Sequence, residues 1–531
     1  MGAALAGVEG AQKILKNMHA KNFAAVDSSP ETARRSAPSD SLAPRGTSGE
    51  RVGERGEFFP ERPFSPRPSP PATGGEGVAR WEVSKICEPA SATSRALKRP
   101  EGRAPGFTRR EFVAGLGLAA AGLAAMPGNV VAAAATPVRR ARKKVAAVVT
   151  HYTLNSHADV LVSRIFQSHM MNGTGAYPDL ELVSVFVDQY TRDDLSQKFA
   201  RQYGFKLCDT IADALTLGGK DLAVDGVLLI GEHGVYPLSP TGQIMYPRRR
   251  FFEETAAVFR RCGRAVPVFN DKHLAWNWTD AKWMYDTARE LKIPFMAGSS
   301  IPGGWRHPEV EATLGARMTE AVGLSYGPME GYGYHALEGL QCLVERRQGG
   351  ETGVAAVQLL MGAEVYAQRE KGRLSQRVFE AAANCREEKK RFKGTFESVV
   401  REPAGFFIEY RDGLRAVIIH DTGPHNSEWV VAWDEAGKPE PPATVFWTQE
   451  ARPMMHFGFL LQGIEEMIHT GKPTWPVERT LLTTGILAAL FESQRKGGAR
   501  IETPHLVIAY QPTFTWKPVP PPPPSRPFTV P

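Results

Sequence analysis

Apolar positions change their spacing repeatedly from residue 144 onward. Short apolar runs rich in β-branched residues are typical of buried strands, whereas apolar residues three or four positions apart are typical of helices. The expected strands span 144–150, 180–188, 206–208, 225–231, 265–270 and 294–300. The expected helices between them span 156–170, 192–204, 210–217, 248–263 and 279–292. Ser156 is placed to cap the first of these helices, and Gly204 to end the second.

The pattern changes after residue 300, where a helical run (335–347) precedes segments of alternating apolar and polar residues. Such alternation is typical of an antiparallel sheet with one packed face. The expected strands are 395–402, 405–421 with an Asp-Gly turn at 412–413, 429–435 and 443–449, and two closing helices are expected at 456–471 and 478–497.

These patterns together predict an α/β fold class. Strands that are apolar along their whole length need cover on both faces, so residues 144–300 are expected to form a Rossmann-like, doubly wound parallel sheet. Residues 301–512 are expected to form an α+β domain with an open, mainly antiparallel sheet. Residues 513–531 are rich in proline and are expected to be a polyproline II tail that need not pack.

The N-terminal 107 residues are rich in Pro, Ser, Gly, Arg and Glu and have no sustained apolar period, which predicts disorder. In residues 108–136, Arg109-Arg110 precedes an Ala/Gly/Leu run, which is typical of a twin-arginine export signal. The alternative is a chance basic pair before an Ala-rich linker. Because such signals normally begin a chain, we expect residues 1–107 to be an upstream extension. Export of this kind predicts a periplasmic or cell-envelope protein that folds, often around a cofactor, before it is transported.

Charge and cysteine usage exclude several classes of partner. The net charge of +7 is concentrated in residues 1–145, which hold 23 Lys and Arg against 13 Asp and Glu, so the rest is slightly acidic and a nucleic-acid partner is not expected. The five cysteines have neither zinc spacing nor a disulfide pattern. The HDTGPH stretch (420–425) would not turn its side chains to one side, so no metal site is expected. No apolar stretch beyond residue 145 has the length of a membrane span.

Three stretches of the sequence point to one family: FNDKHLA (269–275), DAKWMYDTARELKIPFMAGSS (280–300) and GYGYHALEGL (331–340). They resemble, in that order, the Glu-Lys-Pro segment, the helix and strand that follow it, and the Asp-x-Gly-x-His-x-x-Asp stretch of the glucose-fructose oxidoreductase / inositol dehydrogenase / MocA (Gfo/Idh/MocA) family. The resemblance covers about residues 144–512. It implies a two-domain oxidoreductase with NAD or NADP, a sugar-like or cyclic polyol substrate, and a homo-oligomer.

The sequence departs from that family at the phosphate-binding turn. VVTHYTLNSHAD (148–159) has no glycine, although glycines there allow the backbone to approach pyrophosphate. The helix that follows would still offer backbone amides to a phosphate. Asp271 and His273 replace the family's Glu and Pro, and Gly331 and Glu338 replace its two aspartates. Two alternatives therefore stay open: a redox-assisted glycosidase that uses bound NAD, and a carbohydrate- or protein-binding scaffold that has lost the dinucleotide.

The resemblance implies three catalytic residues. Lys272, at the carboxyl end of the fifth strand, would polarise a hydroxyl or carbonyl oxygen; the alternative is a surface lysine. His335 would move the hydroxyl proton; the alternative is a capping or core histidine. Glu338, one helical turn later, would orient His335, with Glu330 as further support, or would simply be a solvated helix residue.

The remaining candidates would bind cofactor or substrate. Asp188 ends the second strand, where an acid binds the adenosine ribose and favours NAD. The other cofactor-binding candidates are Thr150, Ser156, His157, Glu232, His233 and Asp271. The substrate-binding candidates are Trp305, Arg306 and Tyr334. The run Arg248–Arg250 either begins a solvated helix or grips a phosphate.

Overall fold

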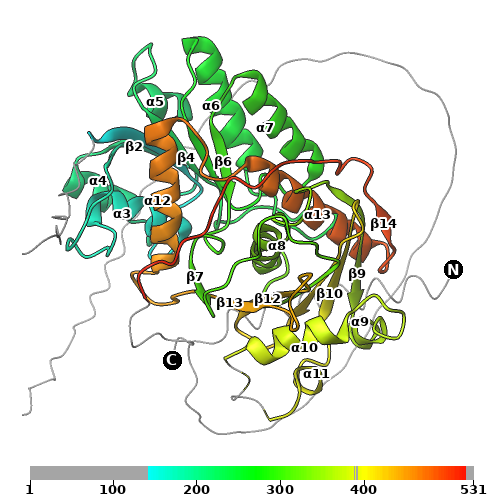
Figure 1. Cartoon of the computed structure of the whole chain (residues 1–531). Coiled ribbons are helices and arrows are strands. Elements are labelled where there is room, and N and C mark those ends of the chain that lie inside the picture. Colours follow the sequence, from blue (N-terminus) through cyan, green and yellow to red (C-terminus); the bar gives the residue numbers. More distant parts are fainter. Residues whose placement is uncertain (1–140, 388, 390–392, 522–531) are drawn as a thin grey trace, which may run out of the picture. The chain divides into compact units, whose positions relative to one another are not determined.

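The first six strands form a parallel sheet in the computed structural model, which describes residues 141–387, 389 and 393–521 (Figure 1). Their bounds are β1 Lys143–Val149, β2 Leu180–Val187, β3 Lys206–Cys208, β4 Gly226–Ile230, β5 Val268–Asp271 and β6 Phe295–Gly298. They lie in the order β3-β2-β1-β4-β5-β6. This is the predicted doubly wound sheet, and its order reverses between β1 and β4, where such sheets bind ligands. The predictions for residues 1–107 and 108–136 lie outside the described residues.

Five helices connect these strands, each near its predicted place. Their bounds are α3 His157–Gln167, α4 Ser196–Tyr203, α5 Ile211–Thr216, α6 Arg248–Cys262 and α7 Trp278–Glu290. The Ser156 side chain accepts a hydrogen bond from the Asp159 amide, and Gly204 ends α4 in the left-handed conformation. Both capping predictions are confirmed.

The second sheet has eight strands. Their bounds are β7 Trp305–His307, β8 Glu320–Tyr326, β9 Val354–Met361, β10 Ala404–Tyr410, β11 Arg415–Asp421, β12 Trp429–Trp433, β13 Ala443–Trp447 and β14 Ile501–Glu502. Their order is β14-β9-β10-β11-β8-β12-β13-β7. The β8–β11 pair is parallel and the other pairs are antiparallel, so the prediction of a mainly antiparallel sheet is confirmed.

One predicted strand, 395–402, is wrong, because residues 396–399 form the short helix α11 (Phe396–Val399). The Thr395 side chain accepts a hydrogen bond from the Ser398 amide and so begins the helix. Phe396 and Val400 are four residues apart and are buried in one cluster with α10 (Gln376–Cys385). The spacing of these apolar residues is helical, although the segment as a whole reads as alternating. The short helix α9 (Ala363–Ala367) was not predicted either.

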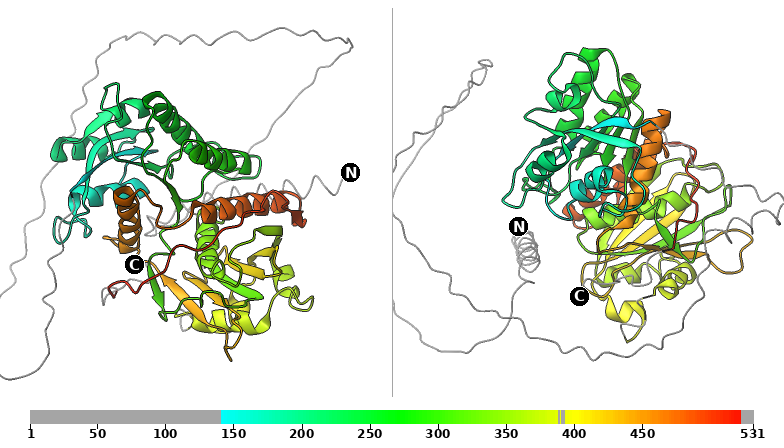
Figure 2. Two further views of the ribbon diagram at one scale, coloured as in Figure 1. Left: turned by 45° about the horizontal axis from the view of Figure 1, so that its top comes forward. Right: turned by 90° about the vertical axis from the view of Figure 1, so that its left-hand side faces the viewer.

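The last two long helices return to different parts of the molecule. Helix α12 (Met455–Thr470) packs against α3 and shares a core with β1, whereas α13 (Val477–Arg495) packs against α8 (Gly331–Val344), α7 and β9. Figure 2 shows α12, in orange, beside the first sheet. The parallel sheet therefore completes its core with a helix that comes almost 160 residues after its last strand.

A single apolar cluster joins β4, α8, α13 and β10, so α8 and α13 fix the ends of β4 and β5 against the second sheet. None of the described helices is both long enough and apolar enough to cross a bilayer.

Candidate active site

A cleft of about 390 Å³ lies at the carboxyl ends of β4 and β5 and at the turn after β1. This is the point where the strand order of the parallel sheet reverses. The first sheet and its loops contribute Asn155, His157, Glu232, His233, Tyr246, Lys272 and His273. The part of the chain after residue 300 contributes Tyr332, His335, Trp429, Glu450, His456 and Phe457, among others. Residues that are distant in the sequence thus enclose a space of the size that holds a small ligand.

Lys272 lies in this cleft with a carboxylate beside it. Its Nζ is 2.8 Å from Glu232 Oε1, and the Arg248 guanidinium donates to Glu232 Oε2 at 2.5 Å. Burial would raise the pKa of Glu232, but the charges of Lys272 and Arg248 lower it well below its usual range. Glu232 is therefore ionised, and both of its oxygens hold cations in place.

His335 extends from the first turns of α8 into the same cleft. Its Nδ1 is 2.6 Å from the Ser299 hydroxyl, which also accepts a hydrogen bond from the Ile301 amide. Burial, followed by the charges of Lys272 and His157, lowers the pKa of His335 well below its usual range. The imidazole is therefore neutral near pH 7, and Ser299 fixes the orientation of its ring. No hydrogen bond to Nε2 is found among the described residues, so this nitrogen is available to a ligand.

His157 and Asp271 form a second polar pair in the cleft wall. Asp271 Oδ2 is 2.6 Å from His157 Nδ1, and both side chains are buried. The His233 ring meets His157 edge-on at 5.2 Å between centroids, and burial lowers the pKa of His233 to about 3. The cleft thus combines neutral imidazoles with a few tightly paired charges.

Backbone strain is concentrated around this cleft. Eight non-glycine residues of the described chain have a left-handed φ, and four of them line the cleft: Asn155, His233, Lys272 and Met454. Such conformations cost about 1 to 3 kcal/mol each and persist where the surrounding structure enforces them, which is common at functional sites. Three of the four follow the ends of β1, β4 and β5. This concentration of strained residues makes the cleft the candidate functional site of the described residues.

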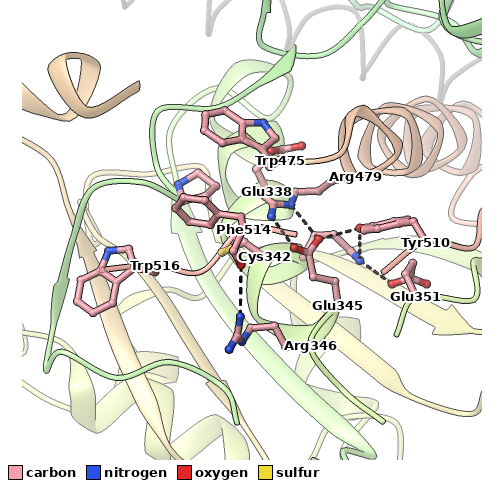
Figure 3. A network of polar contacts seen from close by, with 12 residues as sticks. Glu338, Cys342, Glu345, Arg346, Glu351, Trp475, Arg479, Tyr510, Phe514 and Trp516 are labelled. Atoms are coloured by element: carbon pink, nitrogen blue, oxygen red, sulfur yellow. Dashed lines mark hydrogen bonds and ion pairs between the residues drawn. The ribbon is translucent and has the colours of Figure 1, made fainter. Parts of the chain in front are cut away.

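Several predicted site residues are not brought to the cleft. The Glu338 carboxylate is fully buried and accepts hydrogen bonds from Thr483 at 2.8 Å and Thr480 at 3.2 Å on α13. Figure 3 shows it beside Arg479 and Trp475. Ser299, and not Glu338, therefore orients His335, because the face of α8 that carries Glu338 is covered by α13.

The three predicted substrate-binding residues also lie elsewhere. Trp305 Nε1 donates to the Pro520 carbonyl at 2.6 Å, so the predicted tail packs at least as far as this residue. Arg306 lies under Trp516 at 4.8 Å from its ring centroid, and Tyr334 is fully buried in the core. None of the three is among the residues that line the cleft. Strand β7 turns Trp305 and Arg306 toward the C-terminal segment.

The predicted cofactor-binding residues divide into three groups. His157, Glu232 and His233 line the cleft, and Asp271 supports His157. Thr150 and Ser156 have structural roles: the Thr150 hydroxyl donates to the Glu232 carbonyl at 2.5 Å, and the Ser156 hydroxyl donates to the Thr153 carbonyl at 2.7 Å. Asp188 lies outside the cleft, with Tyr236 and Arg250 on its two oxygens.

These positions test how a nicotinamide dinucleotide would fit. The nicotinamide half fits, because Lys272, Glu232 and His233 end the strands against which that ring lies in a doubly wound sheet. The turn after β1 reaches a left-handed conformation at Asn155 (φ 60°) without glycine, since asparagine tolerates that region. The adenosine half would meet Asp188, Tyr236 and Arg250, whose side chains are already hydrogen-bonded to one another.

The aromatic lining of the cleft was not predicted. Tyr332, Trp429 and Phe457 come from segments up to 125 residues apart, and the rings of Tyr332 and Trp429 lie 5.4 Å apart. Only Tyr332 carried a signal, because it falls in the GYGYHALEGL stretch. His456 and Phe457 begin α12, and their place in the cleft depends on the return of that helix.

Comparison with known proteins gives matches in structure alone. No protein family and no curated protein matches the chain. GenD2 from gentamicin A biosynthesis, solved with NAD, matches 69% of this chain and 97% of its own at 15% identity and a TM-score of 0.43. The myo-inositol dehydrogenase of Lactobacillus casei, solved with NAD(H) and myo-inositol, matches 68% and 96% at 12% identity and 0.42. The scyllo-inositol dehydrogenase of the same organism matches 69% and 99% at 10% identity and 0.42.

Proposed function

We propose that the protein is an oxidoreductase of a sugar-like or cyclic polyol hydroxyl, a divergent member of the Gfo/Idh/MocA family with an NAD-type cofactor. The observation that carries the proposal is the convergence of Lys272 and His335 in one strained cleft. Lys272 follows strand β5 and His335 lies on helix α8, 63 positions later, yet each is held by a hydrogen-bonding partner, Glu232 or Ser299. The names of the similar solved structures, inositol dehydrogenases among them, agree with this substrate class.

The chemistry of the pair follows from its contacts. The Lys272 ammonium donates to Glu232 and keeps further protons for a substrate oxygen, which it would polarise. His335 is neutral and presents Nε2, so it would take the hydroxyl proton as the carbon is oxidised, and return it in the reverse direction. When bound, a nicotinamide cofactor supplies the hydride acceptor for that carbon.

The lining of the cleft supports a ring-shaped polyol as substrate. Tyr332 and Trp429 offer apolar faces, while Glu450 and Thr448 offer polar atoms nearby. A cyclic polyol has both kinds of surface, since its ring carbons form apolar patches between hydroxyls. Pockets that combine an apolar wall with a few polar groups fix the orientation of such ligands.

The test is purification from an exporting host followed by denaturation, which should release NAD or NADP detectable by absorbance and mass. With a polyol substrate, Lys272→Met and His335→Gln should each lower kcat/KM by about 10²- to 10⁴-fold. Lys282→Met, on an exposed part of α7, is the matched control and should leave turnover unchanged. A protein that carries no dinucleotide and binds none when it is added is not this enzyme.

A redox-assisted glycosidase is the second candidate, and the His157–Asp271 pair favours it. Elimination of a substituent that lies two carbons from the oxidised carbon requires a second base, which takes the proton from the carbon between them while the substituent leaves with the bonding electrons. His157 lines the cleft and is oriented by a buried carboxylate, as such a base would be. Uptake of solvent deuterium at that carbon, lost in His157→Gln, distinguishes this reaction from simple oxidation.

The predicted export signal adds the periplasm or cell envelope as the proposed location.

A further inference from the structure

The loop between β4 and α6 is fastened to the end of β2. The Val235 amide donates to Gln189 Oε1 at 2.9 Å, and Gln189 Nε2 donates to the Val235 carbonyl at 2.9 Å. The Tyr236 hydroxyl donates to Asp188 Oδ2 at 2.8 Å, and Arg250 pairs with Asp188 Oδ1. These contacts join the loops that follow β2 and β4 across the end of β1.

This junction lies where a doubly wound sheet holds the adenosine half of a dinucleotide. An acid at the end of the second strand ordinarily binds the ribose hydroxyls. Both oxygens of Asp188 already have partners from the loop and from α6. A Cβ added at Gly234 (φ 94°) would lie 2.9 Å from Gln189 Oε1, so the two loops touch without a gap.

The N-terminus of α3 is occupied in a similar way. Asp159 is fully buried in the first turn of the helix, accepts a hydrogen bond from the Asn155 amide at 2.9 Å, and pairs with Arg452 at 2.5 Å. A helix N-terminus favours anions, and here its own carboxylate meets that preference. A pyrophosphate in this position would therefore meet the Asp159 carboxylate, whose negative charge already occupies this end of the helix.

The fastened loop has internal structure of its own. Leu238 and Ile244 form a β-bridge, and the Ser239 amide donates to the Gln243 carbonyl at 2.8 Å. The Ile244 amide also donates to Glu330 at 2.8 Å, immediately before α8. Residues 234–245 are thus a small folded segment that is held at Gln189 and Asp188 on one side and at Glu330 on the other.

We propose that residues 234–245 of this loop form a latch that closes the adenosine end of the crevice, while Glu232 and His233 remain in the cleft. With the latch closed, the cleft accepts a ligand the size of nicotinamide mononucleotide, and the adenosine half binds only after the Gln189–Val235 and Tyr236–Asp188 contacts break. The cleft volume of about 390 Å³, near the lower end for small-ligand sites, agrees with the smaller ligand. The inference rests on the proposed nicotinamide-dependent function and adds a determinant of cofactor size to it.

The test compares the binding of NAD and nicotinamide mononucleotide to the full chain by isothermal titration calorimetry. The variant Gln189→Ala/Tyr236→Phe lacks three hydrogen bonds of the latch. NAD should bind to this variant at least about tenfold more tightly than to the wild type, because each lost bond lowers the free energy that is needed to open the latch. The affinity for nicotinamide mononucleotide should not change. Gln202→Ala, an exposed glutamine on α4, is the matched control and should behave as the wild type.

Three outcomes would overturn the proposal. Wild type that binds NAD at least tenfold more tightly than the mononucleotide, with no change in the variant, rejects the latch and leaves the proposed function intact. Mononucleotide binding by all forms, without any gain for NAD in the variant, also rejects the latch alone. No binding of either ligand to any form rejects the proposed function and the latch together. If the double variant fails to fold, Tyr236→Phe alone, which removes one hydroxyl, decides between these outcomes.

Discussion

Lys272 combines the three properties that distinguish a site lysine from a loop lysine. It is buried, its backbone is left-handed (φ 60°), and its ammonium faces a carboxylate that also holds Arg248. The sequence predicted the position from the strand end and the family-like segment. It did not predict the pairing with Glu232, because Glu232 lies 40 residues earlier and reaches Lys272 only through the sheet order.

At this scale, Glu232→Gln should destabilise the protein by about 3 to 5 kcal/mol at pH 7, since it leaves two buried cations without their carboxylate. The folded pKa of Glu232 is depressed, so its stabilising contribution is complete above the ordinary value of 4.5 and is lost as the pH falls through the folded value. The difference in unfolding free energy between variant and wild type, measured in urea, should therefore shrink below pH 4.5.

Glu253→Gln is the matched control, because Glu253 pairs with Arg249 on the surface of α6. An exposed pair of this kind contributes about 1 kcal/mol or less. Equal losses in the two variants would mean that the Glu232 cluster is not a buried charge network.

Helices α8 and α13 are joined by a buried ion pair that the sequence did not reveal. Arg479 Nε donates to Glu345 Oε2 at 2.8 Å, and the Tyr510 hydroxyl donates to the same oxygen at 2.9 Å (Figure 3). Glu338 lies on the adjoining face of α8 and belongs to this network through Thr480 and Thr483. Spacing along one helix could not show which neighbour covers that face, and the predicted role of Glu338 failed for this reason.

Removal of the cation from this pair, in Arg479→Met, should lower the free energy of unfolding by about 3 to 5 kcal/mol, because Glu345 would remain buried and charged. Arg495→Met, at the exposed end of the same helix, breaks only the surface pair with Glu492 and should leave the free energy of unfolding close to that of the wild type. Urea denaturation of both variants provides the comparison. A small loss for Arg479→Met would show that the network relaxes or takes in water.

The elements themselves were predictable to different degrees. The parallel strands were recognisable because most of them are continuous apolar runs between amphipathic helices, as in β1 and β4. Strand β9 (VAAVQLLM) was not predicted, because Ala, Gln, Leu and Met are also good helix formers. Its position is decided by its pairing with β10 and β14. The sequence of one strand does not show which other strands it will pair with.

The whole molecule contains many neutral, buried imidazoles. Burial lowers the pKa of His233 and His456 to about 3 and that of His420 to about 4. The unfolded chain takes up protons at these residues below about pH 6.5, while the folded chain does not. The free energy of unfolding should therefore fall between pH 6.5 and pH 4, by about 1.4 kcal/mol per pH unit for each such histidine.

Chemical denaturation at pH 7.5, 5.5 and 4.5 measures this slope. His456→Gln should reduce it by about one proton, because the buried imidazole of His456 stays neutral in the folded protein. A wild-type stability that is independent of pH across this range would contradict the neutral state of the imidazoles.

The parallel sheet also depends on a distant segment, since α12 supplies Leu461, Ile464 and Met467 to its core. Residues 141–300 expressed alone should therefore expose the face that α12 covers and should be largely insoluble or lack cooperative unfolding. Circular dichroism and size exclusion of this fragment, beside the full chain, test the expectation. A soluble fragment that unfolds cooperatively would show that α12 is dispensable.

The late position of α12 in the sequence also affects when the parallel sheet can fold during synthesis. A ribosome produces all six parallel strands long before it reaches residue 455, and throughout that interval the nascent sheet lacks one of its covering helices. Domains that are continuous in sequence can fold as soon as they emerge, but this one has to wait for its last segment. Both sheets therefore complete their folding late and at nearly the same time, and the cleft forms only when the chain is almost finished.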